Sequence, residues 1–395
     1  MEKVLTILFL ISLPIGEMAR IQIGAITLPR VHELILFFLV VYELIKNRET
    51  LVALVKKEPV AKGILLFIVV GVLSLLINVF KLTSEEFVAS SLYLLRWSAY
   101  SGLVFVALGN QVQRTWLLGL YVVGVVFALV GFFQVVLYPY LRNLMYLGWD
   151  PHRFRLFSTL LDPNFMGIIL VIAFLLGLGL WQQTKFRQHL FIIGEAVLLT
   201  ATYLTYSRSA YLALVVGFVI WLWLQKKLGR LGIIGILIFL LAVFFVPRPG
   251  GETLRLDRWD STMARIGNWQ ESITLFERSP VFGLGFDTLR FVTRNNDTFD
   301  PDSHAAGGLD NSFFFVFVTT GVVGAAIYGY LLYQMIDMGM KLLKDRKTRW
   351  FGAGYLAMLA SIGVDSLFIH SQFYPWVMVY VFALTGVGIA MRHLK

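Results

Sequence analysis

Long apolar runs, each of membrane-spanning length and separated by short polar breaks, constrain this chain more than any other feature. A helix needs about 20 residues to cross the hydrocarbon core of a bilayer. Inside lipid only helices and closed barrels satisfy their backbone hydrogen bonds, and these runs lack the polar–apolar alternation of a barrel. The sequence therefore predicts an all-α polytopic membrane protein. We expect about twelve transmembrane helices, over residues 4–20, 31–45, 60–80, 88–109, 115–137, 163–181, 189–206, 209–225, 229–246, 311–335, 350–369 and 373–391.

The composition agrees, because 58% of the residues are hydrophobic and only 15% are charged. The chain has no cysteine, which excludes a thiol nucleophile and a cysteine metal site. Its six histidines show no zinc-binding spacing, and no phosphate-binding loop of the G-x-x-x-x-G-K-[ST] type is present. We therefore expect neither a metal nor a cofactor. The net charge of +10 is informative through its distribution, and no nucleic acid partner is expected.

Basic residues in the polar breaks set the expected orientation. If both termini lie in the cytoplasm, every inner break carries positive charge, as in the clusters at 46–57, 226–230 and 341–349. The first apolar run follows Lys3 and resembles a secretory signal, but it lacks a cleavage site, so we interpret it as a retained span. The sequence thus predicts a multi-pass protein of the inner (plasma) membrane.

The basic residues expected outside are almost all arginine, and Lys81 is the one lysine among them. Positive charge alone would not require this, whereas the planar guanidinium can bind phosphate with two parallel hydrogen bonds. The pattern is either an accident of a basic composition or an outer-face site for a phosphate-bearing lipid. The outer arginines are Arg20, Arg30, Arg142, Arg153, Arg155, Arg208, Arg248, Arg255, Arg258, Arg265, Arg278, Arg290 and Arg294.

Two outer segments are longer than connectors, residues 138–162 and 247–310. The second divides the chain into transmembrane helices 1–9 (1–246), a large periplasmic loop with an amphipathic helix (247–310) and transmembrane helices 10–12 (311–395). The stretch "DSTMARIGNWQESITLFERSP" predicts that helix. One of its faces would carry Met263, Ile266, Trp269, Ile273 and Phe276, and another would carry Arg265, Asn268 and Ser272.

Several polar residues lie at the expected outer ends of spans, and each has an ordinary alternative role. Arg208, beside Ser207 in the tight turn "TYSRSAY", either snorkels to the interface or binds a ligand. Arg96 lies within the fourth span and is either functional or paired with a carboxylate. Asn164 follows "DP" in "LLDPNFMG", which is also a common helix start.

The stretch "LDNSFFFVFVTTGVVG" places a carboxylate directly before a span. Asp310 or Ser312 could cap this helix. The positive end of the helix also favours an ionised Asp310, which could then accept a proton. His304 lies six residues upstream and is another possible base.

The motifs "LLDPNFMG", "YSRSAYLAL", "RIGNWQESITLFERSPVFGLGF" and "DNSFFFVFVTTGVVG" occur in this order over roughly residues 150–330. In order and spacing they resemble the O-antigen ligase and O-antigen polymerase superfamily. The resemblance implies a GT-C-like fold and a polytopic glycosyltransferase that needs no metal. It also implies an undecaprenyl-pyrophosphate-linked glycan donor, used on the periplasmic face.

By this resemblance Arg208 and Arg265 would grip the pyrophosphate. Ligases of the superfamily carry a histidine immediately before the asparagine of the last motif, whereas this chain has Asp310 there, which is closer to the polysaccharide polymerases. The candidate catalytic residues are Asp310, Arg265, Arg208 and His304. The candidate substrate-binding residues are Arg96, Arg153, Arg155, Asn164, Ser207, Trp269 and Asn311.

The expected function is a polymerase that transfers the lipid-linked glycan to a sugar hydroxyl of another lipid-linked repeat unit, with inversion. One alternative is an O-antigen ligase that transfers the glycan to lipid A-core or another acceptor. A transporter of lipid-linked oligosaccharide is a third, although the spans hold few charges, mainly Arg96, Glu195 and Asp365. The expected partners are the lipid-linked oligosaccharide, membrane lipids and a chain-length regulator protein.

Overall fold

A computed structural model describes residues 2–23, 26–108, 113–147, 149–183, 188–226, 229–245, 259–292 and 309–393. The regular secondary structure of these residues is helical apart from a short antiparallel hairpin of β1 (Gln22–Ile23) and β2 (Ile26–Thr27). The α-helices are α1 (Glu2–Ser12), α2 (Val31–Lys46), α3 (Arg48–Lys57), α4 (Pro59–Ile77), α5 (Ser84–Ser101), α6 (Leu103–Val106), α7 (Gln113–Leu137), α8 (Pro163–Gln183), α9 (Gln188–Leu204), α10 (Arg208–Leu224), α11 (Arg230–Phe245), α12 (Trp259–Glu277), α13 (Leu289–Val292), α14 (Ser312–Lys344), α15 (Arg349–Asp365) and α16 (Pro375–His393). Short 3-10 segments are η1 (Leu13–Ala19), η2 (Val79–Lys81), η3 (Leu141–Leu147), η4 (Ser158–Leu160) and η7 (Ser371–Phe373).

A helix lies in each of the twelve segments expected to span the membrane. Among the described residues, α4, α7, α8, α14 and α16 are long and apolar enough to cross a bilayer, and α9, α10 and part of α11 form shorter apolar helices. Large apolar side chains also point out of the bundle, as do Phe38, Phe133 and Val136, which are 65%, 68% and 78% exposed. An integral membrane protein is the class that these features indicate, whereas twelve crossings and a GT-C-like fold stay predictions.

Two expected spans differ in their helical bounds. The helix expected over 4–20 ends at Ser12 and continues as the 3-10 segment η1, in which Gly16 has a positive φ of 67°. A Cβ on Gly16 would overlap the carbonyl oxygen of Thr159, so glycine allows η1 to approach η4. The helix expected over 88–109 begins earlier, at Ser84, because Thr83 and Glu86 form a capping box.

The longest helix, α14, is kinked at Gly321, whose φ is 67°. Residues 280–288, called here the 280–288 loop, pack against the kink backbone to backbone. The N–H of Val322 donates to the carbonyl of Pro280 at 2.8 Å, and the N–H of Leu284 donates to the carbonyl of Val318 at 2.9 Å. The kink thus gives hydrogen-bond partners to a loop that would otherwise have exposed polar backbone in an apolar setting.

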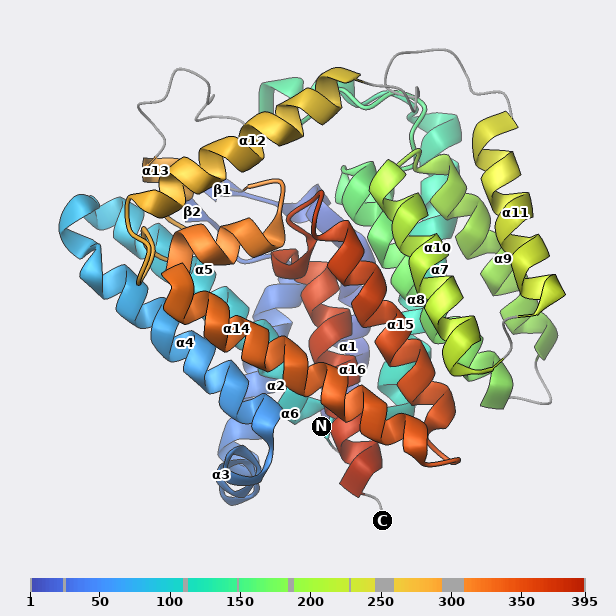
Figure 1. Cartoon of the computed structure of the whole chain (residues 1–395), viewed down its shortest axis with the longest axis horizontal. Helices are drawn as coiled ribbons and strands as arrows, with labels where there is room; N and C mark the ends of the chain where they lie inside the picture. The colour runs from blue at the N-terminus through green and yellow to red at the C-terminus, as the bar shows by residue number, and fades with distance from the viewer. Residues whose placement is uncertain are drawn as a thin grey trace.

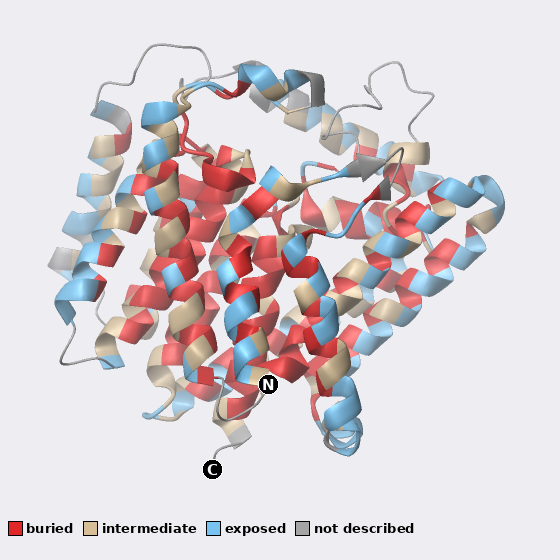
Figure 2. Ribbon diagram, turned by 180° about the vertical axis from the view of Figure 1, so that it is seen from behind, coloured by how far each residue is buried: buried red, intermediate tan, exposed pale blue. Residues whose placement is uncertain are grey.

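Both termini lie at one end of the bundle, and α12 crosses the opposite end (Figure 1). This arrangement agrees with the expectation that the termini share one side, and it places α12, a described part of the 247–310 segment, at the other end. Buried residues gather where the central helices face one another, and exposed residues cover the outer faces (Figure 2). The end that carries α12 is where the candidate site lies.

Helix α12 begins one residue before the stretch expected to form it. The residues of its predicted apolar face differ in their surroundings. Met263, Ile266 and Ile273 are 43%, 40% and 50% exposed. Trp269 and Phe276 instead pack against aromatic rings of α14. Part of the apolar stripe therefore packs on the bundle, and part of it faces outward.

Candidate active site

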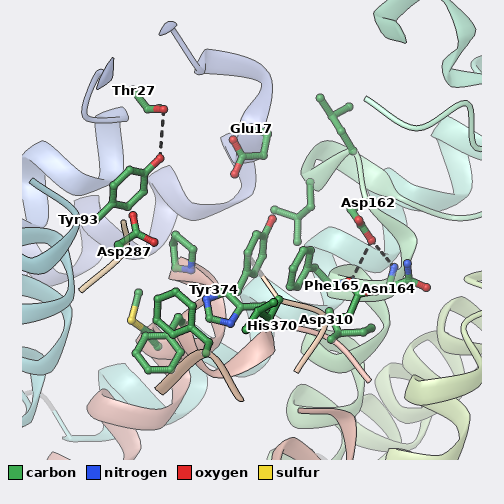
Figure 3. Close-up of a pocket in the computed structure, with 18 of the residues that line it drawn as sticks. Glu17, Thr27, Tyr93, Asp162, Asn164, Phe165, Asp287, Asp310, His370 and Tyr374 are labelled. Atoms are coloured by element: carbon green, nitrogen blue, oxygen red, sulfur yellow. Dashed lines mark hydrogen bonds between the residues drawn. The ribbon is translucent and has the colours of Figure 1, made fainter. Parts of the chain in front are cut away.

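A cavity of about 360 Å³ lies at the end of the bundle crossed by α12. Its walls come from η1, α5, the segment before α8, α12, the 280–288 loop with α13, the start of α14 and the turn between α15 and α16. Figure 3 shows a close-up of it, with Glu17, Asp162, Asp287 and Asp310 among the labelled side chains. Segments from nearly the whole length of the chain thus meet at one place, at the end opposite both termini.

The charged residues of the cavity wall are arginines and carboxylates. No lysine is among the described lining residues, which fits the expected arginine bias of this end. The lining arginines are Arg20, Arg30, Arg96, Arg265 and Arg290. The lining carboxylates are Glu17, Asp150, Asp162, Asp287 and Asp310.

Arg265 and Asp310 are the two expected catalytic residues that the structure brings to this cavity. Arg265 projects from α12, with its guanidinium 5.9 Å from the ring centre of Phe368. Asp310 is exposed to the cavity, yet the protein atoms around it desolvate its carboxyl and raise its pKa, while the positive charge of Arg265 opposes this rise and the charge of Asp150 adds to it. The two motifs therefore place a cation and a carboxylate within each other's electrostatic field.

The start of α14 is capped by Asn311, not by Asp310 or Ser312. The side-chain oxygen of Asn311 accepts hydrogen bonds from the N–H groups of Phe313 at 2.8 Å and Phe314 at 3.1 Å. Its amide nitrogen donates to the carbonyl of Leu367 at 3.2 Å. The side chain of Asn311, expected to bind substrate, thus forms its hydrogen bonds within the protein. The carboxylate of Asp310 faces the cavity.

Arg208 is the first residue of α10 and does not line the cavity. It follows the tight turn expected between the seventh and eighth spans, in which Tyr206 has a φ of 49°. Partial burial lowers the pKa of Arg208, and the positive charge of Arg265 lowers it further, so the two guanidinium groups lie within each other's electrostatic field. Ser207 is buried, with its hydroxyl 3.2 Å from the hydroxyl of Ser209.

Arg155 is almost fully buried and joins three segments of the chain. Its Nε donates to the carbonyl of Thr205 at 2.8 Å, and its terminal nitrogen donates to the side-chain oxygen of Asn164 at 2.9 Å. Asn164 also lines the cavity, whereas Arg155 does not. Arg155 therefore holds the turn before Arg208 against the start of α8, and its place is structural.

The other expected site residues have varied surroundings. Arg96 lines the cavity but is paired with Glu33, Nε to Oε1 at 2.9 Å, as its alternative role required. Arg153 is exposed and lies over the ring of Phe154 at 4.9 Å, outside the cavity. Trp269 packs on Phe314 and does not line the cavity. His304 lies outside the described residues.

Two titratable residues of the cavity wall carry no marked signal in the sequence. Burial raises the pKa of Asp287 to about 7, against the opposing charges of Arg290 and Arg96. Burial lowers the pKa of His370 to about 3, so its ring, stacked on Phe373, is neutral at physiological pH. Asp287 directly follows the motif "RIGNWQESITLFERSPVFGLGF", but the spacing there does not indicate which side chain faces a cavity.

A family model described as O-antigen ligase matches residues 193–329, and no curated protein matches the chain. The matched segment supplies Arg265, Asp287, Arg290 and Asp310 to the cavity, as well as Arg208 beside it. Members of this family are glycosyltransferase-like enzymes. The match confirms, over residues 193–329, the predicted resemblance to the O-antigen ligase and O-antigen polymerase superfamily.

Proposed function

We propose that the protein is a polysaccharide polymerase. It transfers an undecaprenyl-pyrophosphate-linked glycan to a sugar hydroxyl of another lipid-linked repeat unit, on the periplasmic face of the inner membrane. The observation that carries this proposal is that Arg265 and Asp310, from two motifs of the O-antigen ligase domain, line one cavity. A transferase of this kind needs a cation for its leaving group and a proton acceptor for its nucleophile.

The reaction forms a bond between the acceptor oxygen and the anomeric carbon of the donor. The bond from that carbon to the phosphate oxygen breaks, and its electron pair leaves with undecaprenyl pyrophosphate. Negative charge therefore grows on the diphosphate, where Arg265 can bind it with two parallel hydrogen bonds. Arg208, close behind, adds positive charge to the same region. One direct displacement inverts the anomeric centre, and the donor is already activated.

Asp310 is the proposed base. A carboxylate whose pKa is raised takes a proton more readily than an ordinary aspartate, and desolvation at the cavity wall raises the pKa of Asp310. The proton of the attacking hydroxyl passes to this carboxylate as the new bond forms. His304, the alternative base, lies outside the described residues.

A ligase that transfers the same glycan to lipid A-core or another acceptor is the second candidate, which the description of the matching family favours. The polymerase is favoured by Asp310, which stands where the ligases of the resemblance carry a histidine. A chain-length regulator is a proposed partner of the polymerase only.

One experiment separates these candidates. Purified protein in lipid vesicles is given the lipid-linked repeat unit alone, and products are resolved by size. A ladder of lengthening glycans supports the polymerase, and product that appears only after a lipid A-core acceptor is added supports the ligase. If the donor stays intact under both conditions, the proposed chemistry is wrong, and movement of the intact donor across the bilayer would indicate a transporter.

A further inference from the structure

The cavity has two carboxylate-bearing sides, and the proposed chemistry uses only one of them. Figure 3 shows Asp287 near Tyr93 and Thr27 on one side, and Asp310 near Asp162 and Asn164 on the other. The side that bears Asp287 also carries Arg96 on α5 and Arg290 on α13. The proposed chemistry therefore assigns no role to Asp287.

Among the described residues, the carboxylates near Asp287 are held in ion pairs within the fold, whereas Asp287 is not. Glu17 is bound by the guanidinium of Arg30 at 2.7 Å, and Glu33 is bound by Arg30 at 3.0 Å and by Arg96 at 2.9 Å. Within the described part of the chain, Asp287 forms no such ion pair, although it lines the same cavity. Asp287 is half-buried in the cavity wall. A partly desolvated carboxylate without an ion-pair partner is unfavourable, so its retention in a cavity wall points to a ligand.

The backbone holds Asp287 firmly in place. Two glycines of the 280–288 loop, Gly283 and Gly285, adopt positive φ values of 71° and 115°, and the N–H of Gly285 donates to the carbonyl of Thr319 at 3.1 Å. The hydroxyl of Ser90 donates to the carbonyl of Asp287 at 3.2 Å. Asp287 itself has a φ of 56°, which is strained for a residue with a side chain. Strain of this kind persists where the surroundings fix a functional geometry.

We propose that Asp287 binds the acceptor sugar, with its two carboxylate oxygens accepting hydrogen bonds from hydroxyl groups of that sugar. This inference rests on the proposed glycosyl transfer. The reaction joins two glycans, and the donor sugar is fixed by its diphosphate near Arg265. The acceptor must then occupy the remaining part of the cavity, which is the side of Asp287. Its attacking hydroxyl reaches toward Asp310, so Asp287 determines which acceptor is held and Asp310 receives the proton.

Arg290 is the positioning residue for Asp287. The charged groups that face Asp287 are Arg96 from α5 and Arg290 from α13, and both lower its pKa and favour its ionised form. Arg96 is already engaged by Glu33. Arg290 is three residues from Asp287, and among the described residues it forms no ion pair. The positive charge of Arg290 therefore favours the ionised form of Asp287, and Arg290 forms no ion pair with its carboxylate.

The test uses the full-length protein in vesicles, with the lipid-linked repeat unit as donor and the soluble, lipid-free repeat-unit oligosaccharide as acceptor. In Asp287→Asn we expect the KM for the soluble acceptor to rise roughly 10–100-fold, the loss expected for hydrogen bonds to a charged group. Donor affinity and kcat at saturating acceptor should change less than about threefold. Asp337→Asn, a half-buried carboxylate on α14 that pairs with Lys341 away from the cavity, is the matched control and should change neither value.

The outcomes separate this inference from the proposed function. An unchanged acceptor KM in Asp287→Asn, or an equal loss of donor affinity, overturns the acceptor role and leaves the polymerase intact. A wild-type protein that consumes no donor overturns both. Arg290→Gln keeps the carboxylate, so it serves if Asp287→Asn fails to fold. Its acceptor KM should be raised at pH 7 and recover toward wild type near pH 9, and an absence of recovery contradicts the positioning role.

Discussion

The backbone N–H of Asp310 donates a hydrogen bond of 3.1 Å to the side-chain oxygen of Asn268. This bond connects α12 to the entry of α14 across 42 residues of sequence. Arg265 lies one helical turn before Asn268, so the bond also fixes the distance between the proposed cation and the proposed base. Two motifs that are weak separately thus form one unit in the structure.

Asn268→Ala should lower the transfer rate more than it lowers stability. The lost hydrogen bond is worth about 1 kcal/mol of unfolding free energy. A shift of about 1 Å between Arg265 and Asp310 can cost on the order of 100-fold in rate. Thermal unfolding and initial rates on the same preparation check this, with Gln270→Ala on the exposed side of α12 as control. Equal effects of the two substitutions would contradict a positioning role for Asn268.

Arg265→Lys should lower kcat roughly 10²–10³-fold, because an ammonium group cannot form the two parallel hydrogen bonds that stabilise a leaving diphosphate. Arg208→Lys should have a smaller effect, because Arg208 lies beside the cavity and not in its wall. Arg278→Lys, in an exposed residue just beyond α12, is the control. Polymer assembly at the wild-type rate in Arg265→Lys would show that bidentate binding is unnecessary.

Asp310→Asn should abolish turnover and leave binding of the lipid-linked donor measurable. The base is active when ionised, so in the wild type the rate should rise with pH as Asp310 loses its proton. The raised pKa of Asp310 places this rise above the usual aspartate range of about 3.9. A pH–rate profile tests the assignment, and full activity in Asp310→Asn would exclude it as the base.

Gly321→Ala should destabilise the fold and displace Asp287. A Cβ at this position would overlap the carbonyl oxygen of Val281, and the positive φ is itself unfavourable for alanine by about 1–2 kcal/mol. Gly329→Ala is the matched control on the same helix, since no atom lies within 4 Å of a Cβ placed there. We expect a lower unfolding temperature and a raised acceptor KM for Gly321→Ala only. Wild-type behaviour of that variant would show that the loop does not depend on the kink.

The orientation can be tested directly because the chain contains no cysteine. A cysteine in place of Met263, exposed on α12, should react with a membrane-impermeant maleimide added to the periplasmic side of intact cells. A cysteine in place of Lys57, exposed at the end of α3, should react only after the cells are opened. The reverse pattern would place the cavity on the cytoplasmic side and exclude a periplasmic donor.

The sequence by itself determined the helices, their approximate bounds and the two faces of α12, because hydropathy and helical periodicity depend on residues a few positions apart. The motifs also predicted that Arg265 and Asp310 are catalytic residues of the same site. It could not separate Arg265, which lines the cavity, from Arg155, which is buried against Thr205, since both are outer arginines in polar stretches.

Only the tertiary structure decided which charged and polar side chains are paired with one another within the fold. Glu17 and Glu33 bind Arg30 and Arg96, and Asn311 caps α14, so none of these is available to a ligand in the way that Asp287 is. Such pairings depend on how helices distant in sequence pack together. The kink at Gly321, which receives the loop of Asp287, is likewise set by backbone hydrogen bonds between distant segments, and no local pattern encodes them.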